Sequence, residues 1–287
     1  MRKRNLIFLF CMVIMLSSTW PAMKVALMFV SPLIFLMQRC LLASMVLLPL
    51  IAFLNKKFPT DGRTWLHLFI YSIIIAIGMT MSTIGLVYET TGLSSLLTCT
   101  HPIFVFCLAK LFLKERVTPN KIFGMLLGLL GIIILYAERI SFATRSISPI
   151  LLLTSGAFLW AVSMVYFKKF LKNIDQLLVT CIQFFFVFII IFAVTLMFNE
   201  LTFPINPPIL YILSLLYTSI VGMALAIALM LSILKEEETI VVSVSSLIVP
   251  VLATFFGWIF LHETVSFFSF LSFIFILAGI YLVNKER

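Results

Sequence analysis

HPIFVFCLAKLFLKERVT, residues 101–118, is the stretch that decides the fold, because a second version of it, VPVLATFFGWIFLHETVS, stands at residues 249–266. A constant offset of 148 residues aligns the two without a gap and pairs Pro102 with Pro250, Glu115 with Glu263, Val117 with Val265 and Gly131 with Gly279. Apolar residues would match by chance in so hydrophobic a chain, but proline, glutamate and glycine in the same register would not. The sequence therefore predicts two homologous halves.

Composition predicts an all-α integral membrane protein. Hydrophobic residues make up 63% of the 287 residues and charged residues 11%, against roughly 45–50% and 25% in soluble domains. The formal net charge of +9 then concerns the placement of loops relative to the membrane, and no nucleic-acid partner is expected. Five cysteines lie inside apolar runs without a C-x-x-C pair, so we expect neither disulfides nor a metal site.

The apolar runs predict ten transmembrane helices, each near the roughly 20 residues that cross a bilayer core. The short connections leave no room for a soluble domain. We expect a first five-helix repeat at residues 1–137, a connector at 138–148 and a second five-helix repeat at 149–287. The predicted spans are 5–27, 32–54, 65–87, 91–112, 121–137, 149–168, 175–198, 207–233, 239–261 and 266–284.

The positive residues indicate the orientation. With the N-terminus inside, fifteen of the twenty lysines and arginines fall on inner segments, which fits both termini in the cytoplasm. Because five helices per half is an odd number, the second half must enter the membrane inverted. Inverted repeats are typical of alternating-access carriers, in which two similar halves exchange conformations.

At this point the chain resembles the EamA-type, ten-helix members of the drug/metabolite transporter superfamily. The resemblance depends on SSTWPAMK at 17–24, PLIFLMQR at 32–39 and the duplicated proline, glutamate and glycine. It implies a protein of the plasma (inner) membrane of a prokaryote that exports amino acids or related metabolites. It also implies that the spans 121–137 and 266–284 are scaffold, and that the central cavity is lined by the spans 5–27, 65–87, 91–112, 149–168, 207–233 and 239–261.

Hydroxyl side chains indicate such a cavity from the residues alone. They precede each duplicated proline on one stripe of a helix, and proline frees a backbone carbonyl that must meet protein or water. The alternative is that each hydroxyl only bonds its own helix and permits close packing. The stripes are Ser95 and Thr98 before the predicted kink at Pro102, and Ser243 and Ser246 before the predicted kink at Pro250.

Three further side chains are candidates for the substrate pathway. His101 has an apolar counterpart, Val249, so the repeated fold does not require the imidazole; it could contact substrate or carry a coupled proton, or be bonded within the helix bundle. Trp20 and Trp160 could stack on a flat or cationic substrate, or serve ordinary packing.

Three charges are expected to be structural. Arg39 lies deep in its span and needs a partner. Glu115 and Glu263 are expected to cap the helix that follows each of them. Gly124, Gly128 and Gly131 predict a close-packing face, which we expect to pack within one chain and not between two.

These observations predict a secondary transporter that moves small metabolites by alternating access, most simply as an exporter of amino acids or related metabolites. One alternative is uptake or exchange of a larger metabolite such as an S-adenosylmethionine-like nucleotide derivative. Another is a membrane-embedded enzyme or scaffold, but H-E-x-x-H, G-x-S-x-G and P-loop motifs are absent, so no enzyme and no cofactor is expected. A monomer is expected, with a homodimer as the alternative.

Overall fold

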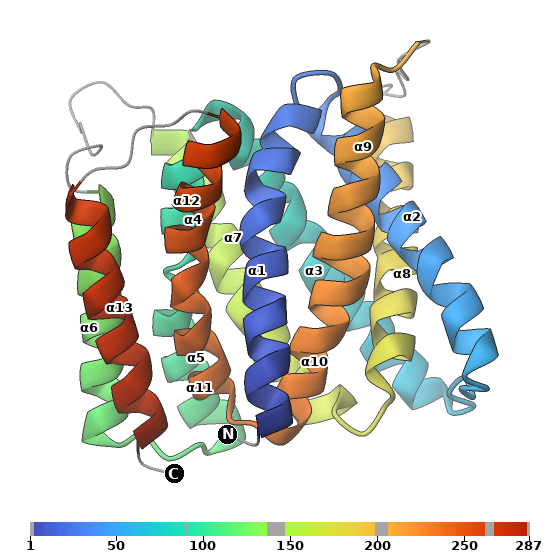
Figure 1. Cartoon of the computed structure of the whole chain (residues 1–287). Helices are drawn as coiled ribbons and strands as arrows, with labels where there is room; N and C mark the ends of the chain where they lie inside the picture. The colour runs from blue at the N-terminus through green and yellow to red at the C-terminus, as the bar shows by residue number, and fades with distance from the viewer. Residues whose placement is uncertain (1–2, 90, 137–146, 199–205, 262–266, 286–287) are drawn as a thin grey trace.

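The computed structural model describes residues 3–89, 91–136, 147–198, 206–261 and 267–285. Within these ranges all regular secondary structure is helical and no strand occurs. The helices form a bundle in which most axes run along one common direction, and the start of α1 and the end of α13 lie at the same end of it (Figure 1). We call this the terminal end of the bundle.

The bundle is built from long α-helices and short π- or 3-10-helical segments, labelled η, that continue or join them. In chain order they are α1 (Lys3–Ala26), α2 (Pro32–Phe53), α3 (Gly62–Tyr88), α4 (Thr91–Thr98), α5 (His101–Leu108), η1 (Ala109–Leu113), α6 (Pro119–Tyr136), α7 (Ile147–Tyr166), η3 (Phe167–Leu171), α8 (Gln176–Met197), α9 (Ile209–Tyr217), η4 (Thr218–Leu225), α10 (Ala226–Glu236), α11 (Thr239–Ser245), η5 (Ser246–Ile248), α12 (Val249–Leu261) and α13 (Phe267–Lys285).

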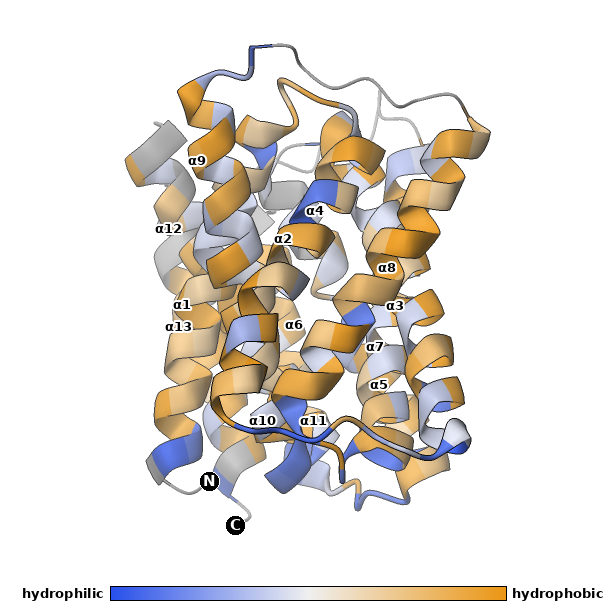
Figure 2. Ribbon diagram, turned by 90° about the vertical axis from the view of Figure 1, so that its right-hand side faces the viewer, coloured by the Kyte–Doolittle hydropathy of each residue, from blue (hydrophilic) through white to orange (hydrophobic). Residues whose placement is uncertain are grey.

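Seven helical stretches of the described chain are long and apolar enough to cross a membrane, and two shorter apolar helices accompany them. Hydrophobic residues cover the middle of the bundle, while hydrophilic residues gather at its ends (Figure 2). The chain is therefore an integral membrane protein, as its composition predicted. The long stretches are Arg4–Ala26, Pro32–Phe53, Gly62–Tyr88, Ile147–Leu171, Gln176–Met197, Ile209–Glu236 and Thr239–Phe256, and the short ones are His101–Leu113 and Leu271–Val283.

Helix starts are set by side chains that accept hydrogen bonds from otherwise unpaired backbone N–H groups. The Asp61 carboxylate accepts from Thr64 N at 2.8 Å and so begins α3. Asp175 accepts from Leu177 N at 2.9 Å at the start of α8 and pairs with Lys56 at 2.8 Å. Partial burial raises the pKa of Asp175, but the hydrogen bond from Lys56 and the neighbouring positive charges outweigh it, so the pKa lies below its usual value.

Two predicted spans are interrupted at equivalent positions. α4 ends at Thr98 and α5 begins at His101, immediately before Pro102. In the second half, the short η5 separates α11 from α12 just before Pro250. The offset of 148 residues carries one break onto the other, so each duplicated proline stands at the start of a new helical segment, where its missing N–H costs nothing.

Glycines allow α6 and α13 to pack closely. These two helices lie side by side at one edge of the bundle (Figure 1). A Cβ built on Gly124 would lie 2.5 Å from the Gly279 carbonyl oxygen and 2.6 Å from Val283 Cγ2. Because atoms do not approach so closely, the two backbones meet only where side chains are absent. The prediction that the glycines pack within one chain is confirmed.

We predict that Gly279→Ala destabilises the protein by roughly 1–3 kcal/mol, the usual cost of overpacking. The added methyl would lie 2.8 Å from Gly128 N and would also meet the Gly124 carbonyl, so α13 must move away from α6. The measurement is the denaturation midpoint of the purified protein in detergent. Gly62→Ala is the control, because no atom lies within 4 Å of a Cβ at Gly62. Equal midpoints for the two variants would contradict this account of the packing.

Candidate functional site

A cavity of about 190 Å³ lies in the middle of the bundle. Its wall is formed by α1, α2, α3, α7, α8 and α10, by η4, and by the interrupted segments around α4–α5 and α11–α12. No described residue of α6 or α13 belongs to the wall, which agrees with the scaffold role that the family resemblance implied. The implied set of lining spans was incomplete, because α2 and α8 also contribute to the wall. The volume is below the roughly 300–1,000 Å³ of sites for drug-sized ligands, so the cavity suits a small molecule.

The structure brings five of the seven predicted pathway residues to this cavity: Trp20, Thr98, His101, Trp160 and Ser246. The other two, Ser95 and Ser243, are buried but do not line it. The Ser243 hydroxyl donates to the Ile240 carbonyl at 2.9 Å within its own helix. For Ser243, therefore, the alternative holds in which the hydroxyl only bonds its own helix.

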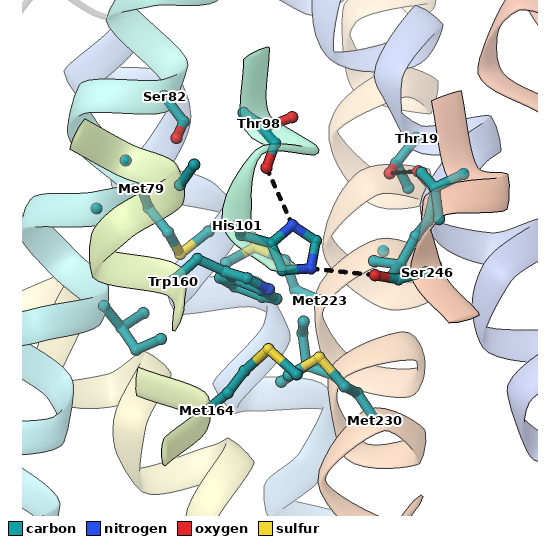
Figure 3. Close-up of a pocket in the computed structure, with 18 of the residues that line it drawn as sticks. Thr19, Met79, Ser82, Thr98, His101, Trp160, Met164, Met223, Met230 and Ser246 are labelled. Atoms are coloured by element: carbon teal, nitrogen blue, oxygen red, sulfur yellow. Dashed lines mark hydrogen bonds between the residues drawn. The ribbon is translucent and has the colours of Figure 1, made fainter. Parts of the chain in front are cut away.

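His101 is the polar centre of the cavity and joins the two interrupted segments (Figure 3). Its Nδ1 lies 3.0 Å from the Thr98 carbonyl oxygen, and its Nε2 lies 3.1 Å from Ser246 Oγ. A carbonyl oxygen only accepts, so Nδ1 carries a proton and donates it. The carbonyl that the break between α4 and α5 would otherwise leave unpaired is thus bonded by the side chain that follows it.

The contact between His101 Nε2 and Ser246 Oγ depends on where the hydroxyl proton of Ser246 points. The Ser246 hydroxyl, 2.7 Å from the Ser243 carbonyl, has a single proton to donate. If it donates to that carbonyl, His101 Nε2 must itself be a donor and the ring is an imidazolium. If the ring is neutral, the hydroxyl turns to Nε2 and leaves the Ser243 carbonyl. Protonation of His101 is therefore linked to the hydrogen bond between Ser246 in η5 and the Ser243 carbonyl in α11.

The apolar part of the wall is rich in methionine, which the sequence analysis did not single out. Methionine side chains are flexible and polarisable and can adapt to ligands of different shape. Four of them lie around His101 and Trp160 in Figure 3. The content of 14 methionines was visible, but nothing in their spacing marks a common wall. The six on the wall are Met12, Met23, Met79, Met164, Met223 and Met230.

Two further polar side chains on the wall were not predicted to line the pathway. Arg39 on α2, predicted to be structural, lines the cavity, and so does Gln183 on α8. The sequence could have indicated Gln183, since it is the only amide side chain in the apolar run of residues 177–198. Among the described residues of the wall there is no aspartate or glutamate.

Glu115 caps a helix, but the expected choice of helix was wrong. Its carboxylate accepts from Thr239 N at 2.8 Å and from Ile240 N at 3.1 Å, which places it at the start of α11 and not of α6. The start of α6 is capped by Thr118 Oγ1, which accepts from Lys121 N at 3.4 Å. Glu263, its counterpart in the second half, lies outside the described residues.

The terminal end of the bundle holds further polar contacts between distant parts of the chain. Asn5 Nδ2 donates to Glu237 Oε1 at 2.7 Å. Ion pairs join Arg4 to Glu236 and Lys121 to Glu238. Together with Glu115 these contacts tie α1, the loop before α6 and the start of α6 to the end of α10 and the start of α11.

This arrangement defines a class of protein: a helical membrane bundle with a small internal cavity built where helices are interrupted, as in membrane carriers. No cluster of metal-binding side chains occurs among the described residues. The EamA-like transporter family matches residues 3–137 and 147–285, and the chain belongs to this family.

Known proteins resemble the chain over most of its length. It is 26% identical over 270 residues to the uncharacterized transporter YoaV of Bacillus subtilis (strain 168), covering 92% of this chain and 91% of the relative. It is 24% identical to a probable amino-acid metabolite efflux pump of Escherichia coli (strain K12), covering 67% and 66%. It is 26% identical to an S-adenosylmethionine/S-adenosylhomocysteine transporter of Chlamydia muridarum (strain MoPn / Nigg), covering 86% and 81%.

The fold is also similar to that of a solved structure. One crystal structure of a protein superposes with a TM-score of 0.83 and 16% identity, covering 100% of this chain and 98% of that one. At this identity the likeness concerns the fold alone.

We predict that Glu115→Ala lowers the free energy of unfolding by roughly 0.5–2 kcal/mol, the usual cost of a lost helix cap. Glu115→Gln should lose less, because its amide oxygen still accepts one hydrogen bond. The check is the thermal midpoint in detergent. Arg116→Ala removes a neighbouring exposed side chain and should leave the midpoint nearly unchanged. If the Glu115 variants behave like the Arg116 variant, the carboxylate does not stabilise the start of α11.

Proposed function

We propose that this protein is a secondary transporter that exports amino acids or related small metabolites by alternating access. The observation that carries the proposal is the central cavity, where interrupted helices from two parts of the chain meet through His101 and Ser246. Interrupted helices around a midplane cavity are the usual substrate site of secondary carriers. The name of the Escherichia coli relative supports amino-acid metabolites as the substrate class.

The architecture we propose is ten transmembrane helices in two inverted repeats, residues 1–137 and 149–287, joined by the connector 138–148. The observed segments group into ten spans if η segments and broken helices count with their neighbours. Three observations support this grouping. The breaks before the two duplicated prolines are equivalent, the family matches the chain in two separate stretches, and the first and last helices begin and end at the same end of the bundle.

We further propose that the terminal end faces the cytoplasm and that its polar contacts close the cavity on that side. The bonds from Glu115 to the start of α11 and from Asn5 to Glu237 join segments of different halves. Opening toward the cytoplasm would require these bonds to separate, while the interrupted helices provide places to bend. Relatives from bacteria support the plasma (inner) membrane of a prokaryote. In the orientation that we propose, both termini lie in the cytoplasm.

A proton is the coupling ion that the cavity chemistry favours. His101 changes its bonding to Ser246 with its protonation state, and a bound proton would thus alter the contact between the two interrupted segments. The other ionisable side chains on the described cavity wall are Arg39, Tyr71 and Cys99. Because none of them is a carboxylic acid, His101 is the cavity side chain that we propose takes up and releases the proton.

The alternative substrate is a larger metabolite of the kind transported by the Chlamydia muridarum relative. The cavity volume of about 190 Å³ favours the smaller substrate. Membership of a transporter family makes an enzyme or a scaffold the weaker alternatives. We propose a monomer as the working unit, since the cavity is formed within one chain.

The proposed topology predicts which side of the membrane labels an introduced cysteine. In a variant without native cysteines, a cysteine at Lys114 should react with an impermeant maleimide only after the cells are permeabilised. A cysteine at His262, outside the described residues, should react in intact cells, because the second half is inverted. Labelling of both positions from the same side would exclude inverted repeats.

The proposed mechanism predicts that His101→Gln lowers substrate flux by about tenfold, the expected effect of losing a buried hydrogen bond of 1–2 kcal/mol, and flattens its pH dependence. The assay is efflux of isotope-labelled amino acids from proteoliposomes between about pH 5.5 and 8, which brackets the ordinary histidine pKa of about 6.5. Ser246→Ala should also change the pH profile, because it removes the partner of Nε2.

Ser243→Ala is the matched control, since its hydroxyl bonds within α11 and does not line the cavity. All variants are first compared for monodispersity. A wild-type pH profile and undiminished flux in His101→Gln would remove this histidine from the mechanism.

A further inference from the structure

Arg39 carries a buried guanidinium that forms no ion pair with any described residue. Its side chain belongs to α2, is 4% exposed and lines the cavity. Its Nε has no hydrogen-bond partner, and its Nη2 reaches only the Thr218 carbonyl oxygen, at a long 3.5 Å. The guanidinium also lies over the Phe35 ring, 5.1 Å from the centroid. An aromatic face and one weak hydrogen bond satisfy little of a group with five donors.

Such a charge is costly unless something pairs with it. Buried charges in proteins are normally paired and hydrogen-bonded. In the part of the chain that the structure describes, Arg39 forms no ion pair; those present join other residues. The cavity wall, as described, offers no acidic side chain. No described acidic residue supplies the missing negative charge, and a ligand bound in the cavity can supply it.

Gln183 is a second unpaired polar group on the same wall. It is 1% exposed, and neither its Nε2 nor its Oε1 has a hydrogen-bond partner. It comes from α8, which packs against α2, the helix of Arg39. A buried amide with both atoms unpaired loses its hydration without compensation. Two adjacent helices that line the cavity thus carry unpaired donors and one unpaired acceptor, in a wall that is otherwise mostly apolar.

We propose that Arg39 and Gln183 form the subsite that binds the carboxylate of the substrate. A guanidinium matches a planar carboxylate through two parallel hydrogen bonds. The Gln183 amide can donate to the same carboxylate or accept from an adjacent ammonium group. A carboxylate brings one negative charge to one buried positive charge, whereas a phosphate dianion would bring one charge too many. The apolar body of the substrate then rests against the methionines of the wall.

This inference rests on the proposed transport function only for the identity of the ligand, because the subsite can be tested by binding alone. The probes are L-leucine and L-methionine, each compared with its carboxamide, which keeps the side chain and the amino group but lacks the negative charge. Methylphosphonate, measured at a pH above its second pKa, tests a dianionic head group. Binding to the purified protein in nanodiscs is measured by calorimetry, and flux is measured separately in proteoliposomes.

We expect the wild-type protein to bind at least one of the two acids about tenfold or more tightly than its amide, as loss of a charge-assisted hydrogen bond implies. Arg39→Gln should abolish this preference, and Arg39→Lys should reduce it, because lysine keeps the charge but not the paired donors. Gln183→Leu should weaken binding of the acid. Lys24→Gln is the matched control: it removes a positive charge that does not line the cavity and bonds instead to the Leu86 and Glu89 carbonyls.

Four results would overturn the proposed subsite: equal affinity for acid and amide, no binding of either acid, tighter binding of methylphosphonate, or an acid preference retained in Arg39→Gln. The comparison of acid and amide binding to the wild-type protein tests the subsite even if a variant fails to fold. Acid-selective binding without any flux would support the subsite and count against transport. Flux that is equal for acids and amides would support transport and reject the subsite.

Discussion

The requirement that every backbone polar group be bonded inside a membrane governs this structure. Continuous helices meet it within themselves, so an interruption is tolerated only where another group takes over the lost hydrogen bonds. At the break between α4 and α5, His101 Nδ1 donates to the Thr98 carbonyl. At the corresponding break in the second half, the Ser246 hydroxyl lies 2.7 Å from the Ser243 carbonyl. The cavity lies where these two interrupted segments meet.

Close helix packing elsewhere stabilises the bundle around this cavity. Glycines on α6 and α13 bring two backbones into contact at the edge of the bundle, and Gly78 and Gly156 do the same between α3 and α7. In lipid, where apolar burial gives helices little reason to associate, such contacts hold a bundle together. The periphery can therefore be rigid while the centre keeps adaptable methionines and polar groups with unpaired atoms.

The polar groups of the cavity divide into two kinds. His101 bonds both the Thr98 carbonyl and Ser246, and so connects the two interrupted segments. Arg39 and Gln183 have atoms that no described part of the chain satisfies. The first kind suits a contact that changes during transport, and the second kind suits a contact that a ligand completes. A carrier needs both, because binding must be linked to the change of shape.

The sequence by itself determined that the chain is helical and embedded in a membrane, because composition and run length depend on no long-range contact. The duplicated spacing likewise located both helix breaks through Pro102 and Pro250. Tertiary structure decided which side chains face the cavity. Ser95 and Ser243 share a helical stripe with Thr98 and Ser246, but they lie one turn farther from the breaks, and only Thr98 and Ser246 line the cavity.

The sequence also did not reveal which groups the charged side chains bond. Glu115 was predicted to cap the helix next to it, yet the N–H groups it bonds belong to α11, more than a hundred residues away. Arg39 was expected to have a structural partner, but whether a buried charge meets an acid or an empty cavity depends on how α2, α8 and η4 pack. Local patterns determine which groups a segment must satisfy; only the fold decides which groups are near enough to satisfy them.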